Sequence, residues 1–298
     1  MLVLVLAFTH LHRGDTIITA AITIDLLTEA IGVEIKDECN LESIRPSLVI
    51  EWEMKQMKKA YTEYALVLML IIGTTYANAE ENASNPLAAV NNTDVRWQYF
   101  DLDGPERNDF WLDGAYMLTP KLKLKYELHY WDTDVTGSNE SGFETFHLKP
   151  IYFPTQGEWG SWKYKLAVGV EWIVGFGNED KGIGSGSDQI APLAGVAFVR
   201  GGTVLVPLVQ HFVEYDGPDV NQTSFRLIAI QSLPNNFWGK LDAKVPVDWD
   251  NNAVPASVEA QLGRMFTPSF GTYVDGLLGI GDDKPYDWGL GVGFRFNS

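Results

Sequence analysis

The chain has 298 residues, of which 46% are hydrophobic and 12% aromatic, so it can form one large folded domain and does not have the composition of a disordered protein. Its 22 Lys and Arg against 39 Asp and Glu exclude a general attraction to nucleic-acid phosphates, so we predict no nucleic-acid partner. The one cysteine, Cys39, excludes a disulfide framework and a thiolate metal site, and we predict no metal and no other cofactor.

Residues 54–79 have the parts of a secretory signal peptide. Three lysines within 55–59 form a basic head, an apolar run covers 65–72, and small residues precede a cleavage point expected between Ala79 and Glu80. A transmembrane anchor is the alternative, but it would need about 20 apolar residues. The segment therefore predicts export.

The position of the signal peptide predicts the limits of the other parts of the chain. Residues 1–53 precede it and are predicted to be an over-extended start outside the fold, with the true initiator at Met54 or Met57. Residues 80–93 are predicted to be an N-terminal segment that can plug the fold that follows. Residues 94–298 are predicted to form a transmembrane β-barrel.

Beyond residue 93, apolar and polar residues alternate with period two, which predicts β-strands. The pattern is clearest in residues 121–134. There the apolar positions are Leu122, Leu124, Tyr126, Leu128 and Tyr130, and the polar positions between them are Lys123, Lys125, Glu127 and His129. We predict strands at residues 94–102, 109–119, 121–134, 142–153, 161–175, 190–200, 203–215, 222–233, 236–249, 256–266, 269–280 and 286–297.

Alternation alone also suits a soluble sandwich, whose apolar face meets a core. The predicted segments, however, have the length that a tilted strand of about ten residues needs to cross the hydrocarbon. Aromatic residues also gather at the segment ends, as in interfacial girdles. One predicted girdle is Tyr130, Trp131, Trp172, Tyr215, Trp249, Tyr286 and Trp288, and the other is Tyr116, Tyr152, Phe153, Trp159, Trp162, Trp238, Phe266 and Phe270. The fold class is therefore all-β, a closed antiparallel up-and-down transmembrane barrel of about 12 strands.

The connections between predicted strands alternate between short and long. The short ones, predicted to be periplasmic, are at residues 119–120, 200–202, 233–235 and 267–268, with a longer one at 154–160. The others, richer in Gly, Asp and Asn and predicted to face the exterior, are at residues 103–108, 135–141, 176–189, 216–221, 250–255 and 281–285. A closed sheet leaves no unpaired strand edge in lipid.

The segment ERNDFWLDGAYMLTPKLKLKYELHYW, residues 106–131, resembles the first hairpin of Gram-negative outer-membrane β-barrel transporters of the phenol-degradation (MetA-pathway) type. The resemblance extends loosely over residues 94–298 through the hairpin pattern and the aromatic last strand. It implies a channel for small, often aromatic or apolar, molecules and carries no catalytic motif. The end of the chain departs from the family, because Asn297 and Ser298 follow Phe296.

If the apolar faces meet lipid, the polar faces line a lumen. The candidate lumen-lining residues are Arg96, Asp113, Lys123, Lys125, Glu127, His129, His147, Lys149, Lys163, Lys165, Glu171, Arg226, Lys240, Asp242, Lys244, Asp248, Glu259, Asp275 and Arg295. One interpretation is an acidic mouth above a basic constriction that sorts solutes by charge. The other is a network of paired charges that replaces a hydrophobic core.

Residues 190–199 and 203–209 break the pattern, because they are apolar on both faces, and Ile228 and Ile230 continue this wall. An apolar lumen wall would suit an amphipathic or aromatic solute. Alternatively, an inward-folded loop or the N-terminal segment 81–90 packs there as a plug.

Three functions remain open at this point. The leading hypothesis is an outer-membrane channel for small solutes, the second is a plugged barrel acting as a receptor, adhesin or structural protein, and the third is an outer-membrane hydrolase. His129, His147 and His211 have acids nearby in sequence but no nucleophile motif, so we predict no enzyme. The expected partners are outer-membrane lipid and lipopolysaccharide, the barrel-assembly machinery and a small-molecule solute; no oligomeric state is predicted.

Overall fold

The computed structural model describes residues 82–298, and the predicted over-extended start, signal peptide and cleavage point lie outside this range. Within it, no helix is long and apolar enough to cross a membrane. The strands follow the chain as β1 (Asn92–Asp101), β2 (Glu106–Thr119), β3 (Leu122–Thr133), β4 (Glu140–Tyr152), β5 (Gln156–Trp159), β6 (Trp162–Gly175), β7 (Asp188–Arg200), β8 (Thr203–Asp216), β9 (Asn221–Leu233), β10 (Phe237–Asp248), β11 (Ala256–Thr267), β12 (Phe270–Ile280) and β13 (Trp288–Asn297). Two short 3-10 helices, η3 (Glu179–Lys181) and η4 (Pro234–Asn236), lie in connections.

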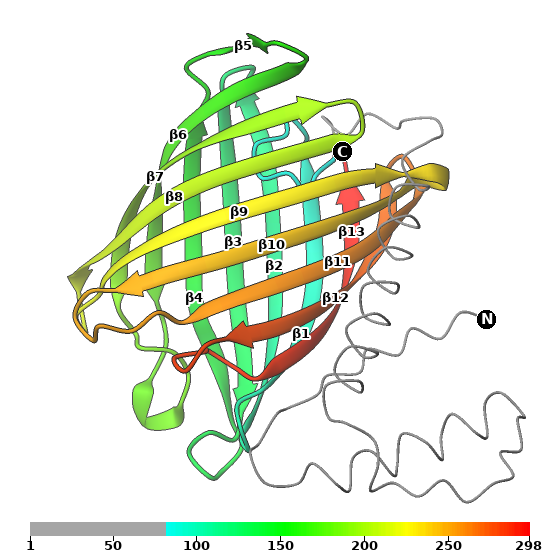
Figure 1. Cartoon of the computed structure of the whole chain (residues 1–298). Coiled ribbons are helices and arrows are strands. Elements are labelled where there is room, and N and C mark those ends of the chain that lie inside the picture. Colours follow the sequence, from blue (N-terminus) through cyan, green and yellow to red (C-terminus); the bar gives the residue numbers. More distant parts are fainter. Residues whose placement is uncertain (1–81) are drawn as a thin grey trace, which may run out of the picture. The chain divides into compact units, whose positions relative to one another are not determined.

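The strands close into one barrel (Figure 1). Neighbours in the chain pair antiparallel, β1 pairs with β13, and β4 pairs with β6. The short β5 pairs with the first residues of β6 and is not a wall strand of its own. The prediction of a closed antiparallel barrel of 12 strands is thus confirmed. The one strand that the sequence did not predict, β5, lies in the predicted 154–160 connection.

The two ends of the barrel differ in the length of their connections. Most turns at one end, which we call the short-turn end, are brief, as at residues 120–121 and 201–202. The other end, which we call the long-loop end, carries the longest connection, residues 176–187, with η3 inside it. In outer-membrane barrels short turns are periplasmic and long loops extracellular.

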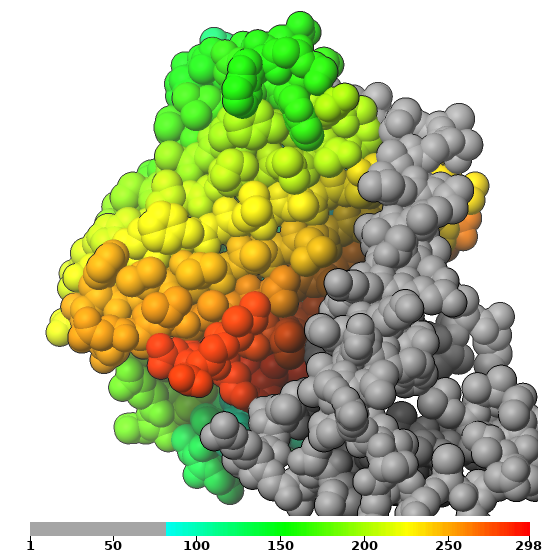
Figure 2. All heavy atoms as spheres, in the orientation of Figure 1, coloured from blue at the N-terminus to red at the C-terminus, as the bar shows by residue number. Residues whose placement is uncertain are grey.

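Large apolar side chains cover the outside of the barrel. Leu241, Leu262, Val274 and Leu290 are each half or more exposed in the middle of their strands. Figure 2 shows this outer surface over the strands coloured from yellow to red, β9 to β13. A soluble protein rarely exposes so continuous an apolar surface, whereas a transmembrane barrel presents one to lipid.

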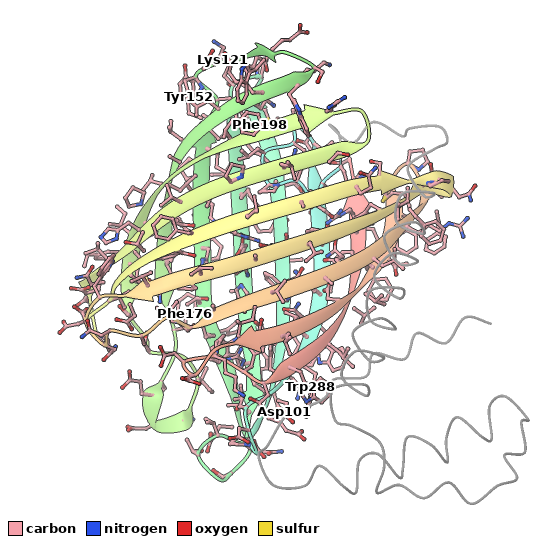
Figure 3. All side chains as sticks on the ribbon, in the orientation of Figure 1. Asp101, Lys121, Tyr152, Phe176, Phe198 and Trp288 are labelled. Atoms are coloured by element: carbon pink, nitrogen blue, oxygen red, sulfur yellow. The ribbon has the colours of Figure 1, made fainter. Side chains whose placement is uncertain are left out.

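Aromatic side chains mark both ends of the barrel. In Figure 3, Tyr152 and Phe198 lie at the short-turn end, and Phe176 and Trp288 lie at the long-loop end. All four are exposed or half-buried, as interfacial residues are expected to be. The girdle pattern is therefore present.

Four aromatic residues assigned to the girdles from the sequence lie elsewhere. Phe153 and Trp238 are buried. Trp131 and Tyr286 line the inside of the barrel. The reason for Trp131 is the pleat: it lies two residues from His129, an inward residue, so period two turns it inward as well.

Candidate functional site

Charged side chains on the inner faces of neighbouring strands pair with one another. Nη2 of Arg96 on β1 lies 2.7 Å from Asp275 on β12 and 2.9 Å from Glu259 on β11. Glu259 also lies 2.6 Å from Nζ of Lys240 on β10. These four residues therefore link four of the twelve wall strands by ion pairs.

Asp242 on β10 extends this row of charges to β9. Arg226 donates to both of its carboxylate oxygens, from Nε at 2.7 Å and from Nη2 at 2.5 Å. Lys240 lies 3.7 Å from the same carboxylate. Because Asp242 is almost completely buried, it needs these cations to remain charged.

On the opposite wall, Glu171 on β6 is the centre of a second group. Its carboxylate accepts from Gln210 on β8, lies 2.9 Å from Nζ of Lys149 on β4, and lies 2.7 Å from Nδ1 of His147 on the same strand. Glu171 is buried, and these partners satisfy both of its oxygens.

Glu127 on β3 connects this second group to β2. Lys149 and Lys125 lie 3.8 and 3.5 Å from its Oε1, and Nε2 of His129 lies 3.9 Å from its Oε2. The other ring nitrogen of His129 lies 3.1 Å from Asp109 on β2.

We refer to these paired residues together as the ion-pair belt. Its members are Arg96, Asp109, Lys125, Glu127, His129, His147, Lys149, Glu171, Arg226, Lys240, Asp242, Glu259 and Asp275. Breaking one buried pair leaves an uncompensated charge, which costs roughly 3–5 kcal/mol. The contacts thus favour the interpretation of the lumen charges as a network that replaces a hydrophobic core.

Nearer the short-turn end, the N-terminal segment 82–91 is tied to the inner wall by polar contacts. Nζ of Lys123 donates to the carbonyl oxygens of Pro86 and Ala88, at 3.2 and 2.8 Å. Nη1 of Arg295 donates to the Ser84 hydroxyl at 2.9 Å.

Arg295 also pairs with a carboxylate of the first strand. Its Nη2 lies 2.6 Å from Oδ2 of Asp94, which also accepts from the Tyr273 hydroxyl at 3.1 Å. Both members of the pair are buried, and β1 and β13 are thereby joined by side chains as well as by backbone.

Leu87 anchors the same segment by apolar contact. It is 1% exposed and belongs to a buried cluster with Val204, Val206, Ile228 and Ile230. These residues come from β8 and β9, where the sequence is apolar on both faces. Of the two explanations left open for that wall, the contacts favour packing against the N-terminal segment.

In the part of the chain that the structure describes, a chamber lies on each side of the ion-pair belt. The inner chamber, about 130 Å³, lies between the N-terminal segment and the belt. The outer chamber, about 430 Å³, lies toward the long-loop end. Trp111, Glu127 and Lys244 line both and therefore lie where the chambers meet.

The mouth of the outer chamber includes Tyr286, from the connection between β12 and β13. Its ring centroid lies 4.8 Å from that of Phe100. Burial raises the pKa of the Tyr286 phenol, so this side chain stays neutral at physiological pH.

No protein-family model matches the sequence, and no curated protein matches it either. Among solved structures, a COG4313 outer membrane channel from Pseudomonas putida F1 is similar at 12% identity and a TM-score of 0.55, over 76% of this chain and 100% of that one. The NanC porin is similar at 9% identity and a TM-score of 0.51, over 69% of this chain and 98% of that one. The fold is that of bacterial outer-membrane barrels. Together with the closed sheet and its apolar outside, this confirms the predicted outer-membrane location.

A lower-scoring likeness is to outer membrane phospholipase A from Escherichia coli, at 15% identity and a TM-score of 0.44, over 74% of this chain and 96% of that one. It adds nothing to the assignment of the fold. The narrower phenol-degradation type stays a prediction.

Most of the candidate lumen residues lie on the inner face of the barrel. Those in the belt have been described, while Lys123 and Arg295 contact the N-terminal segment. Asp113 and Lys244 line the inner chamber. Lys163 and Lys165 line a separate pocket of about 500 Å³ beside the N-terminal segment.

Asp248 lies apart from the other candidates. Its carboxylate accepts from the backbone N–H groups of Asp250 and Asn251, at 3.0 Å each, in the loop after β10. The residue thus terminates a strand and organises a turn, which is a common use of aspartate.

Several inner residues were missed in the sequence. They are Asp94, Gln98, Arg107, Trp111, Gln210, Gln261 and Tyr273. Period two could have found several of them, because Asp94 and Gln98 flank Arg96 at a spacing of two, and Arg107 and Trp111 precede Asp113 at even spacing.

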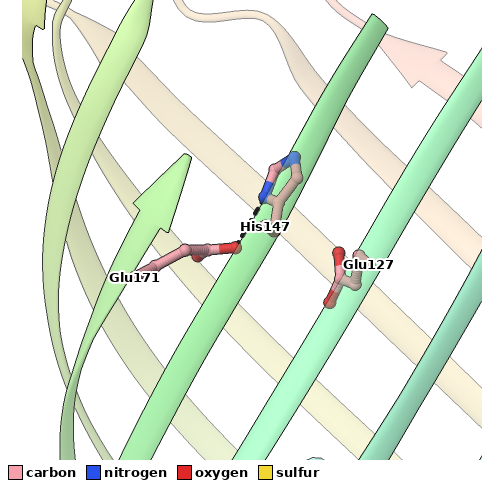
Figure 4. A group of neighbouring side chains, drawn as sticks. All are labelled: Glu127, His147 and Glu171. Carbon is pink, nitrogen blue, oxygen red and sulfur yellow. Dashed lines mark hydrogen bonds and ion pairs between the residues drawn. The ribbon is translucent and has the colours of Figure 1, made fainter. Parts of the chain in front are cut away.

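Glu127, His147 and Glu171 are close enough to suggest a metal site, with one ligand atom of each within 4.8 Å of the others (Figure 4). Their contacts argue against it. Lys149 lies 2.9 Å from Glu171, and both ring nitrogens of His147 already have partners, in Glu171 and Thr145. A cation would have to displace Lys149, so we assign these residues to the belt.

His147 and Glu171 also form a hydroxyl–imidazole–carboxylate row with Thr145. Nε2 of His147 lies 2.8 Å from Oγ1 of Thr145, while Nδ1 lies 2.7 Å from Glu171. A hydrolase uses such a row to activate its nucleophile. Here the Thr145 hydroxyl donates to Glu144, and Glu171 is shared with Lys149. We therefore assign these three residues to the hydrogen-bond network of the lumen and not to a catalytic base and nucleophile.

Proposed function

We propose that the protein is a channel for small solutes across the bacterial outer membrane. The observation that supports this is the polar inside of the barrel, with a chamber on each side of the ion-pair belt. Paired charges alone can fill the lumen of a small barrel, but the two chambers leave space beside them that water can reach. Charged side chains that line water-accessible space are instead typical of pores.

The size of the chambers limits what could pass. The inner chamber, at about 130 Å³, holds only a few water molecules beside the N-terminal segment. Passage of a solute would therefore require segment 82–91 to move from the wall formed by Val204 and Ile230. The apolar character of that wall and the resemblance of residues 106–131 both favour an amphipathic or aromatic solute over a large hydrophilic one.

Planar-bilayer recording tests the proposal. Purified protein is expected to conduct ions in small steps, and liposomes containing it are expected to swell in small solutes. Protein that is inserted, shown by its resistance to protease in the lipid, but electrically silent would contradict a channel.

A plugged barrel that acts as a surface receptor is the second candidate. Two contacts favour it: Leu87 packs in the inner apolar cluster, and Lys123 binds two carbonyls of the same segment. Deleting residues 178–187, in the long loop, separates the two functions. A gate would change the conductance, whereas a receptor would lose its ligand and keep its conductance unchanged.

The surroundings of the barrel follow from the same proposal. The apolar outer face would contact lipid and, at the long-loop end, lipopolysaccharide. The barrel-assembly machinery would insert the chain.

A further inference from the structure

We infer that the outer chamber is a binding site for a small solute that carries a carboxylate, held between Arg107 on β2 and Lys244 on β10. This inference names a solute class for the proposed channel and so rests on that function. Both side chains line the same chamber of about 430 Å³.

Arg107 is held in place without a carboxylate partner. Its guanidinium carbon lies 4.6 Å from the ring centroid of Phe100 and 4.2 Å from that of Trp131, so the cation lies between two aromatic rings. Among residues 82–298, no carboxylate oxygen lies within 4.0 Å of its nitrogens. Aromatic rings orient a guanidinium and leave its N–H groups able to bind an anion.

Lys244 is the second cation of the outer chamber that has no direct carboxylate partner. The carboxylates nearest to it along the wall, Asp242 and Glu259, are engaged by Arg226, Lys240 and Arg96. In the described part of the chain, no carboxylate lies within 4.0 Å of the Lys244 ammonium. Because it lines both chambers, it lies on the path that a solute would follow.

Three of the four acids that line the outer chamber are held by other cations. Asp109 pairs with His129, and Glu127 pairs with Lys125 and Lys149. Glu259 pairs with Arg96 and Lys240. Glu144 accepts from the neighbouring Thr145 hydroxyl, keeps its charge and attracts Arg107 from more than 4.0 Å.

Three buried N–H groups of the chamber wall also favour an anion. Nε of Arg107, Nε1 of Trp111 and Nε1 of Trp131 are buried donors without an acceptor among residues 82–298. All three side chains line the outer chamber. An unsatisfied buried donor costs about 1–3 kcal/mol, so a carboxylate that draws these groups toward it would be stabilised.

The aromatic residues of the chamber determine which group beside the carboxylate the solute can carry. The aromatic residues that line the chamber with the two cations are Phe100, Trp111, Trp131, Phe212 and Tyr286. A flat apolar group would stack on these rings, which prefer offset or edge contacts. Benzoate combines this shape with a carboxylate and is therefore the probe of choice.

Equilibrium dialysis of radiolabelled benzoate against the purified full-length protein in detergent, at fixed ionic strength, measures the site directly. Wild type is expected to bind at one saturable site. Arg107→Gln and Lys244→Gln are each expected to weaken binding about tenfold or more, because each removes one charge-assisted contact. Lys244→Arg keeps the charge and is expected to bind within about threefold of wild type.

Lys284→Gln provides the matched control, because Lys284 lies in the loop after β12 and pairs with Asp287 outside the lumen. It is expected to bind benzoate as wild type does. The different migration of boiled and unboiled samples on a gel confirms that each variant has formed its barrel. Arg107→Gln alone could disturb the stack of rings, so the Lys244 variants decide the outcome if that variant does not assemble.

Two results would overturn the inference. One is the absence of saturable binding to wild type, and the other is equal binding by wild type and both Gln variants. Conductance measured on the same samples separates this failure from that of the channel. If the barrel conducts but does not bind benzoate, only the binding site is rejected. If it is electrically silent but binds benzoate through Lys244, only the channel function is rejected.

Discussion

The guanidinium of Arg96 on β1 contacts the carboxylate of Asp275 on β12, at 2.7 Å, across the intervening strand β13. The two residues are 179 positions apart in the sequence. The contact is possible because the residues of β13 that lie between them are Gly291 and Gly293, which have no side chain. At these two inner positions β13 has no side chain, so its neighbours can pair over it.

Asp275→Ala tests how much this pair contributes. The substitution leaves Arg96 with Glu259 alone, and we expect the free energy of unfolding to fall by roughly 3 kcal/mol. Urea titration of the barrel in lipid vesicles measures it. Asp248→Ala, in a turn outside the belt, serves as the control and should cost less than about 1 kcal/mol. Equal effects of the two variants would contradict the role of the belt.

Gly293→Val tests the need for glycine at this inner position of β13. A side chain there would overlap the ring of Tyr273, so we expect slow or failed barrel assembly. Gly276→Ala is the matched control, because a Cβ at Gly276 on β12 would meet nothing within 4 Å. Gel mobility of unboiled outer membranes reports assembly. Normal assembly of the Gly293 variant would show that the inner face is not packed as described.

Most of the wall could be predicted from the sequence, because the alternation of Leu122 to Tyr130 with Lys123 to His129 is the direct result of the β pleat. The exceptions have physical causes. The strand β5 was missed because Gln156–Trp159 pairs only with the first residues of β6, beyond the span of the wall.

The site was harder to predict than the wall. Periodicity tells which face a residue occupies but not which residue of another strand it meets. The pairing of Arg96 with Asp275 depends on the register of β1, β12 and β13, which no local pattern contains. Arg107 was missed because an arginine near a strand end looks like a surface residue until Phe100 and Trp131 are placed around it.

Leu87→Asp tests the attachment of the N-terminal segment. A carboxylate among Val204, Val206 and Ile230 would be desolvated without a partner, so the segment should leave the wall. We expect a larger single-channel conductance and new cleavage within residues 82–91 by added protease. Ala89→Asp is the control, since Ala89 is exposed and should tolerate the charge. An unchanged conductance in the Leu87 variant would mean that this segment does not limit the pore.

Val274→Lys tests the lipid-facing surface. Val274 is 54% exposed in the middle of β12, and a lysine facing lipid there should cost about 2–4 kcal/mol. Refolding into vesicles, followed by urea titration, measures the loss. A lysine introduced in the 281–287 connection, at Asp282, should have little effect. No difference between the two positions would indicate that water covers both.

The central claim is that lipid covers one face of each strand and that the other face encloses a polar lumen. Nitroxide labels placed singly along residues 272–278 of β12 in vesicles test it most directly, by their collisions with oxygen and with a water-soluble nickel complex. We predict that oxygen accessibility peaks at residues 274, 276 and 278, where nickel accessibility is low, and that oxygen accessibility falls at residues 273, 275 and 277, which face the inside of the barrel. Low accessibility to both reagents at residues 274 and 278 would mean that protein covers this face, and would contradict the barrel in the membrane.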